Sequence, residues 1–272
     1  MFGITAAALT ANAAADRPHL GAQTNAWTIR NFDGLLDVLQ KMRGYGYEGF
    51  ETGYRNVESQ FSNPDARAKI AASGLRFFGV HIWQEKDQYD PATRIAPESL
   101  YRRVAEGASR LNAEHMILSG WPYDSLSKKI EALHAAGKFG QSLHLPVLYH
   151  NEYPEFANGR TEMDELIRGT DPSLLNFILD AGHCFRAGAD PVAFFRKHHT
   201  RLAAMHLRDF IGDEQVPLGQ GKFPLAALAR AVRDTKWSGW LMNEEERVGS
   251  RPGDAAIAPA HEVLVKTFGG AA

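Results

Sequence analysis

The chain has 272 residues, a formal net charge of -2, 44% hydrophobic residues and 23% charged residues. This composition is typical of a folded protein with a full core, and the near-zero net charge gives no general attraction to nucleic acid. The single cysteine, Cys184, excludes an intramolecular disulfide framework, and no apolar run is long enough to span a bilayer. We therefore expect a small-molecule partner, neither nucleic acid nor a membrane, and leave a homo-oligomer open.

Residues 1–17 are expected to lie outside the fold. The stretch is small and weakly apolar, and Ala13-Ala14-Ala15 before Asp16 resembles a signal-peptidase site. No Lys or Arg precedes that site, so the positive region of a secretory signal is missing. The segment is either a frayed tail or the end of an export signal. The protein is accordingly either cytoplasmic or periplasmic.

Eight strand–helix units follow that tail. Short apolar runs bounded by turn residues predict buried parallel strands, and apolar residues at helical spacing predict helices. The predicted strands are 20–27, 47–53, 76–83, 114–121, 146–152, 174–180, 202–209 and 240–244. The predicted helices are 32–42, 64–73, 97–111, 124–143, one that begins at 161, 191–198, 224–234 and 259–268.

The alternation of strands and helices favours a parallel sheet. Because eight units follow one another without a break in composition, a closed (β/α)8 TIM barrel is favoured over two doubly wound halves. We therefore predict one α/β domain that covers residues 18–272. In such barrels the chemistry lies at the carboxyl ends of the strands.

The stretch 177–191 contains the clearest of these strand ends. Its apolar run stops at Asp180, and Asp190-Pro191 supplies an N-cap and a first helical residue for the next helix. Taken alone, Asp180 is equally well explained as a turn residue. Three other strands end in the same way, which favours a shared site.

Four ligand-type residues end the fifth to the eighth strands, namely Glu152, Asp180, His206 and Glu244. Since strand side chains alternate, the inward-facing ends of these strands converge at the mouth of the barrel. Three carboxylates and one imidazole suit one divalent metal (Mn, Co, Mg or Zn), which would remove most of the repulsion among the carboxylates. The alternative is that they are unrelated polar residues at the rim.

At these motifs the chain resembles the xylose-isomerase-like TIM barrels of the sugar phosphate isomerase/epimerase family. The resemblance rests on LYHNEYPEF (148–156), LDAGH (179–183), RAGADP (186–191), MHLRD (205–209), VPLGQG (216–221) and GWLMNE (239–244). It implies one divalent metal held by the same four residues. Many members read His-Asn-His where this chain has His150-Asn151-Glu152. We prefer Glu152 as the ligand and His150 as a base beside it, and the reverse assignment stays open.

Other side chains near the predicted mouth are candidates for binding a substrate. The resemblance implies that His183 contacts substrate, and the alternative is a histidine in a turn. Arg208 is placed to hold a substrate oxygen, a ligand carboxylate or a plain salt bridge. Glu51, His81 and Trp121 end earlier strands and could line a sugar pocket, with Trp121 stacking on a sugar ring. Ordinary barrel packing also explains these three.

Glu152, Glu244 and His150 are the predicted catalytic residues. A bound divalent metal would act as a Lewis acid on a ketone oxygen and an adjacent hydroxyl. A carboxylate or a histidine within reach would remove the proton beside the carbonyl and form an enediolate. Return of that proton gives an isomerase or epimerase. Loss of a β-substituent gives a dehydratase or lyase, as in relatives that resemble inosose dehydratase or keto-glycoside lyases.

Two other classes of protein were weighed. An endonuclease like the apurinic-site repair barrels needs further His and Asp ligands and a basic face, which the net charge does not favour. A sugar-binding barrel without activity has no need of four convergent ligands. The loop at Gly219-Gln-Gly221 lacks the residues of a phosphate-binding loop, so the expected substrate is an unphosphorylated sugar or cyclitol.

Overall fold

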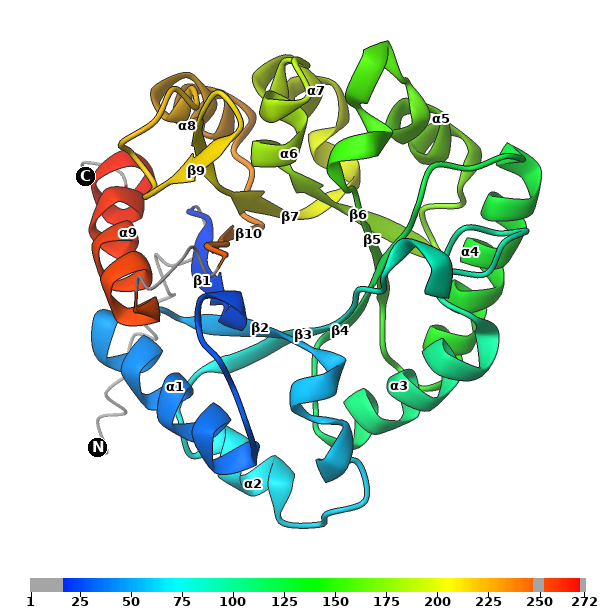
Figure 1. The fold of residues 1–272 in the computed structure, drawn as a ribbon, viewed down its shortest axis with the longest axis vertical. Helices are drawn as coiled ribbons and strands as arrows, with labels where there is room; N and C mark the ends of the chain where they lie inside the picture. Colours follow the sequence, from blue (N-terminus) through cyan, green and yellow to red (C-terminus); the bar gives the residue numbers. More distant parts are fainter. Residues whose placement is uncertain (1–16, 247–251, 270–272) are drawn as a thin grey trace, which may run out of the picture.

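The computed structural model describes residues 17–246 and 252–269, so the predicted tail up to residue 16 lies outside the described residues. Eight parallel strands close into a barrel in the order β1-β10-β7-β6-β5-β4-β3-β2. Helices surround the barrel on its outside (Figure 1). The predicted (β/α)8 TIM barrel is confirmed. Within the described residues, no helix combines the length and apolar character needed to cross a membrane.

The elements follow the predicted order. The barrel strands are β1 (His19–Gln23), β2 (Gly49–Gly53), β3 (Arg76–Ile82), β4 (His115–Ser119), β5 (Val147–His150), β6 (Leu175–Asp180), β7 (Leu202–Leu207) and β10 (Trp240–Asn243). The α-helices are α1 (Phe32–Tyr45), α2 (Ala66–Ala71), α3 (Glu98–Arg110), α4 (Leu126–Ser142), α5 (Glu162–Gly169), α6 (Ala181–Arg186), α7 (Pro191–His198), α8 (Leu225–Thr235) and α9 (Gly253–Phe268). Short 3₁₀ turns are Thr24–Ala26, Tyr54–Asn56, Glu58–Gln60, Lys86–Gln88, Tyr153–Glu155, Ala157–Gly159 and His199–Arg201.

Two helices differ from the prediction. Helix α6 begins directly after β6, where a turn was expected, because the carboxylate of Asp180 caps it by accepting a hydrogen bond from the backbone N–H of His183 at 2.7 Å. Helix α9 was expected to begin at Pro259 but begins at Gly253. The proline removes one backbone donor inside the helix. The buried Ile257 and Ala260 nevertheless pack the helix against the core on both sides of that position.

A two-stranded antiparallel hairpin that was not predicted follows β7, with β8 (Asp209–Ile211) and β9 (Glu214–Val216). The carboxylate of Asp209 orders it by accepting hydrogen bonds from four backbone N–H groups, those of Phe210, Gly219, Gly221 and Phe223. Gly221 has no space for a side chain, since an added Cβ would lie 2.1 Å from Oδ1 of Asp209. Backbone donors that are far apart along the loop thus share one buried acceptor.

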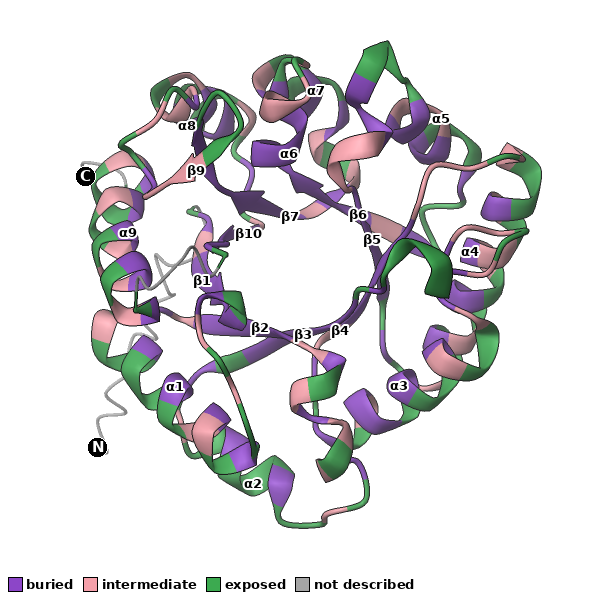
Figure 2. Cartoon of the chain, in the orientation of Figure 1, coloured by how far each residue is buried: buried purple, intermediate pink, exposed green. Residues whose placement is uncertain are grey.

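The barrel has a second, smaller core of buried side chains, and Figure 2 shows that the barrel strands are coloured mostly as buried. This core consists of Phe78, Ile117, Leu148, Ile178, Ala204, Trp240 and Met242. Glycines on the nearby strands β1 and β2 make room for its large members, since an added Cβ at Gly49 would lie 2.5 Å from the ring of Trp240. At Gly21 it would lie 2.4 Å from the sulfur of Met242. This interior plug closes the barrel below the strand ends, so any site must lie above it.

A buried ion cluster outside β5 holds the loop that follows this strand. Lys129 of α4 is fully buried, and its Nζ donates to Glu155 at 3.0 Å and to Glu162 at 2.7 Å. Glu155 also accepts a hydrogen bond from the hydroxyl of Tyr149 and one from the backbone N–H of Glu152 at 2.7 Å. The backbone of Glu152 is therefore held by Glu155, which in turn is paired with a cation from helix α4.

We predict that Lys129→Met lowers the free energy of unfolding by about 3–5 kcal/mol, because it removes the buried cation that Glu155 and Glu162 share and leaves Glu162 with the exposed Arg160 alone. Lys128→Met is the matched control, because Lys128 is the exposed neighbour on the same helix. Its effect should stay within about 0.5 kcal/mol. Urea unfolding at neutral pH measures both. Equal effects of the two substitutions would contradict the role given to the cluster.

Candidate metal and substrate site

Every barrel strand contributes one buried polar side chain directly above the interior plug. Each lies two positions after a glycine or an apolar residue on the same strand, as alternation along a strand requires. These residues are at most 3% exposed, and they are Gln23, Glu51, His81, Ser119, His150, Asp180, His206 and Glu244. The strand ends thus form a closed layer of polar groups directly above the interior plug.

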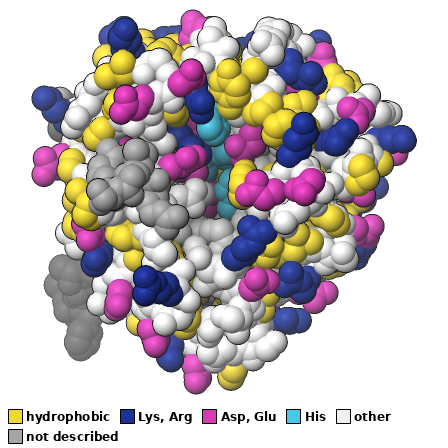
Figure 3. Space-filling model, in the orientation of Figure 1, with side chains coloured by type: hydrophobic (Ala, Val, Ile, Leu, Met, Phe, Trp, Pro, Cys, Tyr) yellow, Lys and Arg dark blue, Asp and Glu magenta, His cyan; other side chains and the backbone are white. Residues whose placement is uncertain are grey.

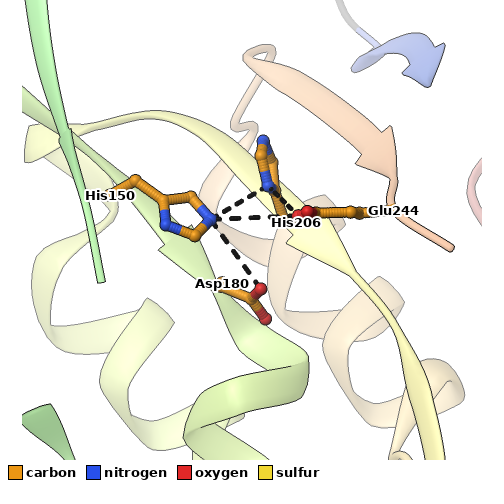
Figure 4. Close-up of side chains that lie close together, drawn as sticks. All are labelled: His150, Asp180, His206 and Glu244. Carbon is orange, nitrogen blue, oxygen red and sulfur yellow. Dashed lines mark hydrogen bonds and ion pairs between the residues drawn. The ribbon is translucent and has the colours of Figure 1, made fainter. Parts of the chain in front are cut away.

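Four of these side chains form the compact cluster that Figure 4 shows, namely His150, Asp180, His206 and Glu244. One ligand-type atom from each lies within 4.8 Å of the others. His150 Nε2 lies 3.0 Å from His206 Nδ1, 3.7 Å from Asp180 Oδ2 and 3.9 Å from Glu244 Oε2. Two imidazoles and two carboxylates that point at a common centre can hold a divalent metal.

Neighbouring side chains orient one nitrogen of each ring toward the centre of the cluster, where Nδ1 of His206 lies 2.5 Å from Oε2 of Glu244. His206 contacts a carboxylate oxygen of Glu51 at 2.8 Å through Nε2, which makes this nitrogen the donor and leaves Nδ1 facing the cluster. His150 lies 3.3 Å from the hydroxyl of Ser119 through Nδ1, and its Nε2 faces the cluster. A carboxylate behind a ligand histidine is a common arrangement at metal sites, because it fixes the tautomer and the orientation of the ring.

Arg208 binds the two carboxylates of the cluster. Its Nε lies 2.9 Å from Asp180, its Nη2 lies 2.6 Å from Glu244, and its Nη1 lies 2.5 Å from Glu246. Of the roles predicted for Arg208, the structure shows the pairing with the carboxylates of Asp180 and Glu244. Asp180 Oδ2 is buried and accepts no hydrogen bond within the described residues, despite the nearby Nε. A buried carboxylate oxygen that accepts no hydrogen bond suits a cation as its partner.

Glu152 lies beside this cluster and outside it. Its Oε1 accepts a hydrogen bond from Ser119 at 2.9 Å, and its Oε2 lies 3.4 Å from Nε2 of His183. Because β5 ends at His150, Glu152 is already part of the following 3₁₀ turn. The distances place His150 closer than Glu152 to the other three ligand-type residues. His150 thus shares a group with Asp180, His206 and Glu244, whereas Glu152 belongs to a second group with His81 and His150, and the choice between Glu152 and His150 as first ligand stays a prediction.

The charges of the neighbouring groups shift the acid–base properties of this layer. Burial disfavours the charged form of His206, but the carboxylates of Glu51 and Glu244 outweigh it and raise the pKa to about 10. Burial also disfavours ionised Glu51, yet His206 and His81 lower its pKa to about 2. Burial lowers the pKa of His150, which keeps its ring neutral at pH 7. Against the effect of burial, hydrogen bonds from His150 and His183 hold the pKa of Glu152 well below its usual value.

A cavity of about 520 Å³ opens above the layer, and Figure 3 shows its hollow with histidine side chains at the bottom. Its described lining consists of Gln23, Asn25, Gly53, Tyr54, Arg55, His81, Trp83, Glu152, His183, Arg208, Glu244 and Glu246. The structure thus brings His81, His183 and Arg208 to the cavity, as expected from the sequence. Glu51 lies behind them, against His206.

Trp121 is not part of the described lining. Its ring lies against Lys86, with Nζ at 4.7 Å from the ring centre, and its stacking role stays a prediction. Trp83, which directly follows β3, lines the cavity with its aromatic ring in its place. Sequence reasoning also missed Asn25, whose side chain donates to Glu244 at 2.9 Å. The strand-end rule that identified Glu51 and His81 would have found Gln23 and Ser119. No signal in the sequence marked Tyr54 or Arg55.

Comparisons with known proteins agree with this architecture. The profile of the xylose isomerase-like TIM barrel family matches residues 39–267. An inosose dehydratase of Geobacillus kaustophilus is 25% identical over 84% of this chain and 87% of its own length. A sugar phosphate isomerase/epimerase of Parabacteroides distasonis superposes with a TM-score of 0.71 at 18% identity, over 96% of this chain and 98% of its own. The 3-keto-D-glucoside 4-epimerase of E. coli gives 0.71 at 15% identity, over 92% and 99%.

These likenesses differ in what they establish. The family profile covers most of the chain and confirms the resemblance inferred from the strand-end motifs. The two structures have low identity and show the shared fold alone. Several further inosose dehydratases match over shorter stretches, and the chain spans 47–51% of their length.

We predict that His206 carries a proton at pH 8 in chelator-treated protein. Its pKa rises from 6.5 to about 10 on folding, so its contribution to stability is complete below pH 6.5 and is lost as the pH rises toward 10. NMR of ¹⁵N-labelled histidine measures the titration directly. A ring that titrates near pH 6.5 in the metal-free protein would show that Glu51 and Glu244 do not hold it as described.

Proposed function

The chain belongs to the xylose isomerase-like TIM barrel family, and from that premise we propose that it is a metal-dependent isomerase or epimerase of a sugar or cyclitol. In this proposal the enzyme removes the proton beside a carbonyl group and returns it to the same or to the neighbouring carbon. The observation that carries the proposal is the convergence of His150, Asp180, His206 and Glu244 at the floor of a cavity. The names of the isomerases and epimerases that share the fold support it.

His150, Asp180, His206 and Glu244 are the proposed metal ligands. Their donor set of two imidazoles and two carboxylates suits Mn²⁺, Co²⁺ or Zn²⁺, and Mg²⁺ less well, because Mg²⁺ prefers oxygen ligands. When bound, the ion supplies Lewis-acid chemistry that makes the proton beside a carbonyl more acidic. Glu51 holds the ring of His206, and Arg208 holds the carboxylates of Asp180 and Glu244.

Glu152 is the proposed acid–base residue. Its carboxylate lines the cavity, is 17% exposed and is ionised at neutral pH, because His150 and His183 stabilise its charge. It can therefore accept a proton from a substrate carbon that lies above the cluster. His183 then faces the same substrate from the start of α6, as the family resemblance implies. Glu244 also lines the described cavity and is the second candidate for proton transfer.

A dehydratase is the second candidate function. The observation that favours it is that several relatives with similar sequences are inosose dehydratases. Both functions begin with the same proton abstraction and use the same residues. They diverge when the enediolate either takes up a proton or loses a hydroxyl group from the β-carbon. The fate of that intermediate depends on the substrate and on the group that protonates its leaving oxygen.

We predict that protein purified without chelator contains about one divalent metal ion per chain. His150→Ala should lose this ion, because the substitution removes a ligand. Glu152→Gln should retain it. Glu51→Gln should weaken binding by about 10–100-fold, as is typical when the partner of a ligand histidine is lost. Elemental analysis and metal titration measure these effects. Retention by His150→Ala together with loss by Glu152→Gln would restore the assignment preferred from the sequence.

We predict that metal-loaded enzyme exchanges the proton beside the carbonyl of a ketose or keto-cyclitol with solvent deuterium. Glu152→Gln should slow this exchange by about 10²–10⁴-fold without loss of metal, as expected for a lost acid–base group. Chelator should abolish it. NMR of candidate substrates in D₂O detects the exchange and identifies the product. A product that lacks one water supports the dehydratase, and cleavage of abasic DNA without any exchange would refute both functions.

A further inference from the structure

The outer wall of the cavity carries one arginine whose charge is not balanced. Arg55 follows β2, is exposed and lines the cavity. Its Nη2 donates to the amide oxygens of Gln84 at 2.9 Å and Gln88 at 3.5 Å. Its guanidinium lies 5.0 Å from the centre of the Tyr54 ring. Among the described residues these neutral groups are its contacts, and no carboxylate forms an ion pair with it.

The groups that hold Arg55 are themselves fixed. Gln84 is 5% exposed, and its Nε2 donates to the hydroxyl of Tyr54 at 3.3 Å. The backbone N–H of Gln84 donates to the hydroxyl of Tyr89 at 3.2 Å. The guanidinium is therefore positioned by amide and phenol groups that leave its charge intact. Arg208 differs in this respect, because three carboxylates neutralise it.

An exposed aromatic surface lines the same cavity. Trp83 is 43% exposed, which is unusual for a tryptophan in a monomeric domain, and it lines the cavity together with Arg55. An indole face binds the C–H face of a sugar or cyclitol ring, and a free guanidinium beside it binds an anionic substituent. The pair therefore fits a ring that bears a negative charge.

We infer that the substrate is a sugar or cyclitol that carries a carboxylate, which Arg55 binds while Trp83 packs against the ring. This inference rests on the proposed function and specifies its substrate class. At the inner end of the cavity Arg208 is already paired with Asp180, Glu244 and Glu246, and the ionised Glu152 repels an anion, so the carboxylate group of the substrate points outward to Arg55 and its carbonyl points toward the cluster. A single guanidinium matches a carboxylate, whereas phosphate sites usually add a helix N-terminus or a nest of backbone N–H groups.

The test is an NMR titration of the full-length protein with matched neutral and acidic sugars. The probes are D-glucose with D-glucuronate, D-galactose with D-galacturonate, and D-glucose 6-phosphate. The wild type should bind each carboxylate about tenfold more tightly than its neutral partner, as expected for one charge-assisted contact at a partly exposed site. Arg55→Gln should abolish this preference and leave the neutral sugars unchanged, whereas Arg55→Lys should retain part of it.

Arg67→Gln is the matched control, since Arg67 is an exposed arginine on α2 that does not belong to the described lining. It should keep the preference, which excludes a general effect of net charge. The titration is repeated after chelation, because a carboxylate that binds the metal directly would lose its preference there. Equal binding of acidic and neutral sugars, including no binding of either, overturns the inference. A preference for the acidic sugars that survives Arg55→Gln, or that disappears on chelation, also overturns it. Tighter binding of D-glucose 6-phosphate than of the carboxylates does the same.

These outcomes are separate from the fate of the proposed function. The titration measures binding in the presence and absence of metal, whereas proton exchange in D₂O measures the chemistry. An Arg55-dependent preference without proton exchange would leave the anion subsite in place and remove the isomerase proposal. Proton exchange on a neutral ketose without such a preference would leave the isomerase proposal in place and remove the anion subsite.

Discussion

The burial of several carboxylates at the carboxyl ends of the strands of one barrel is the constraint on which this site depends. Glu51, Asp180 and Glu244 are at most 2% exposed, and unpaired charges at such depth are strongly unfavourable. The described residues balance them with Arg208 and with a proton on His206. A divalent cation can take the place of that proton. Charge balance and metal affinity are therefore two aspects of the same arrangement.

Below this layer, the apolar plug and the glycines of the first strands set the depth of the floor. Above it, the loops are held by buried carboxylates that accept backbone N–H groups. Glu155 accepts a hydrogen bond from the backbone N–H of Glu152 and is paired with Lys129. Asp209 accepts hydrogen bonds from backbone N–H groups of the loop after the β8–β9 hairpin. Glu152, the proposed acid–base residue, and Arg208, which binds the carboxylates of Asp180 and Glu244, are thus held by loops that are themselves anchored in the protein interior. This rigidity suits a reaction in which one proton moves over a short distance.

The cavity has two parts, the polar layer of strand ends at its bottom and a wall of loop residues. In the proposed function, the polar layer carries out proton abstraction beside a carbonyl, a step that both candidate reactions share. The wall, with Arg55, Trp83 and Tyr54, is then the part that contacts the rest of the substrate. The proposal thus assigns the reaction to the strand ends and the choice of substrate to the loops.

The sequence by itself determined the barrel and most of the cluster, because both follow from local rules. Alternation along a strand and the position of a polar residue at its end identified Asp180, His206 and Glu244. It did not decide between His150 and Glu152, because that choice depends on where β5 ends and on the 3₁₀ turn that Lys129 and Glu155 stabilise from other elements. Only the tertiary structure showed that Arg208 faces the cluster while Arg55 faces the cavity with its charge unbalanced. Contacts between side chains far apart in the sequence decide both, and no periodicity of the chain encodes them.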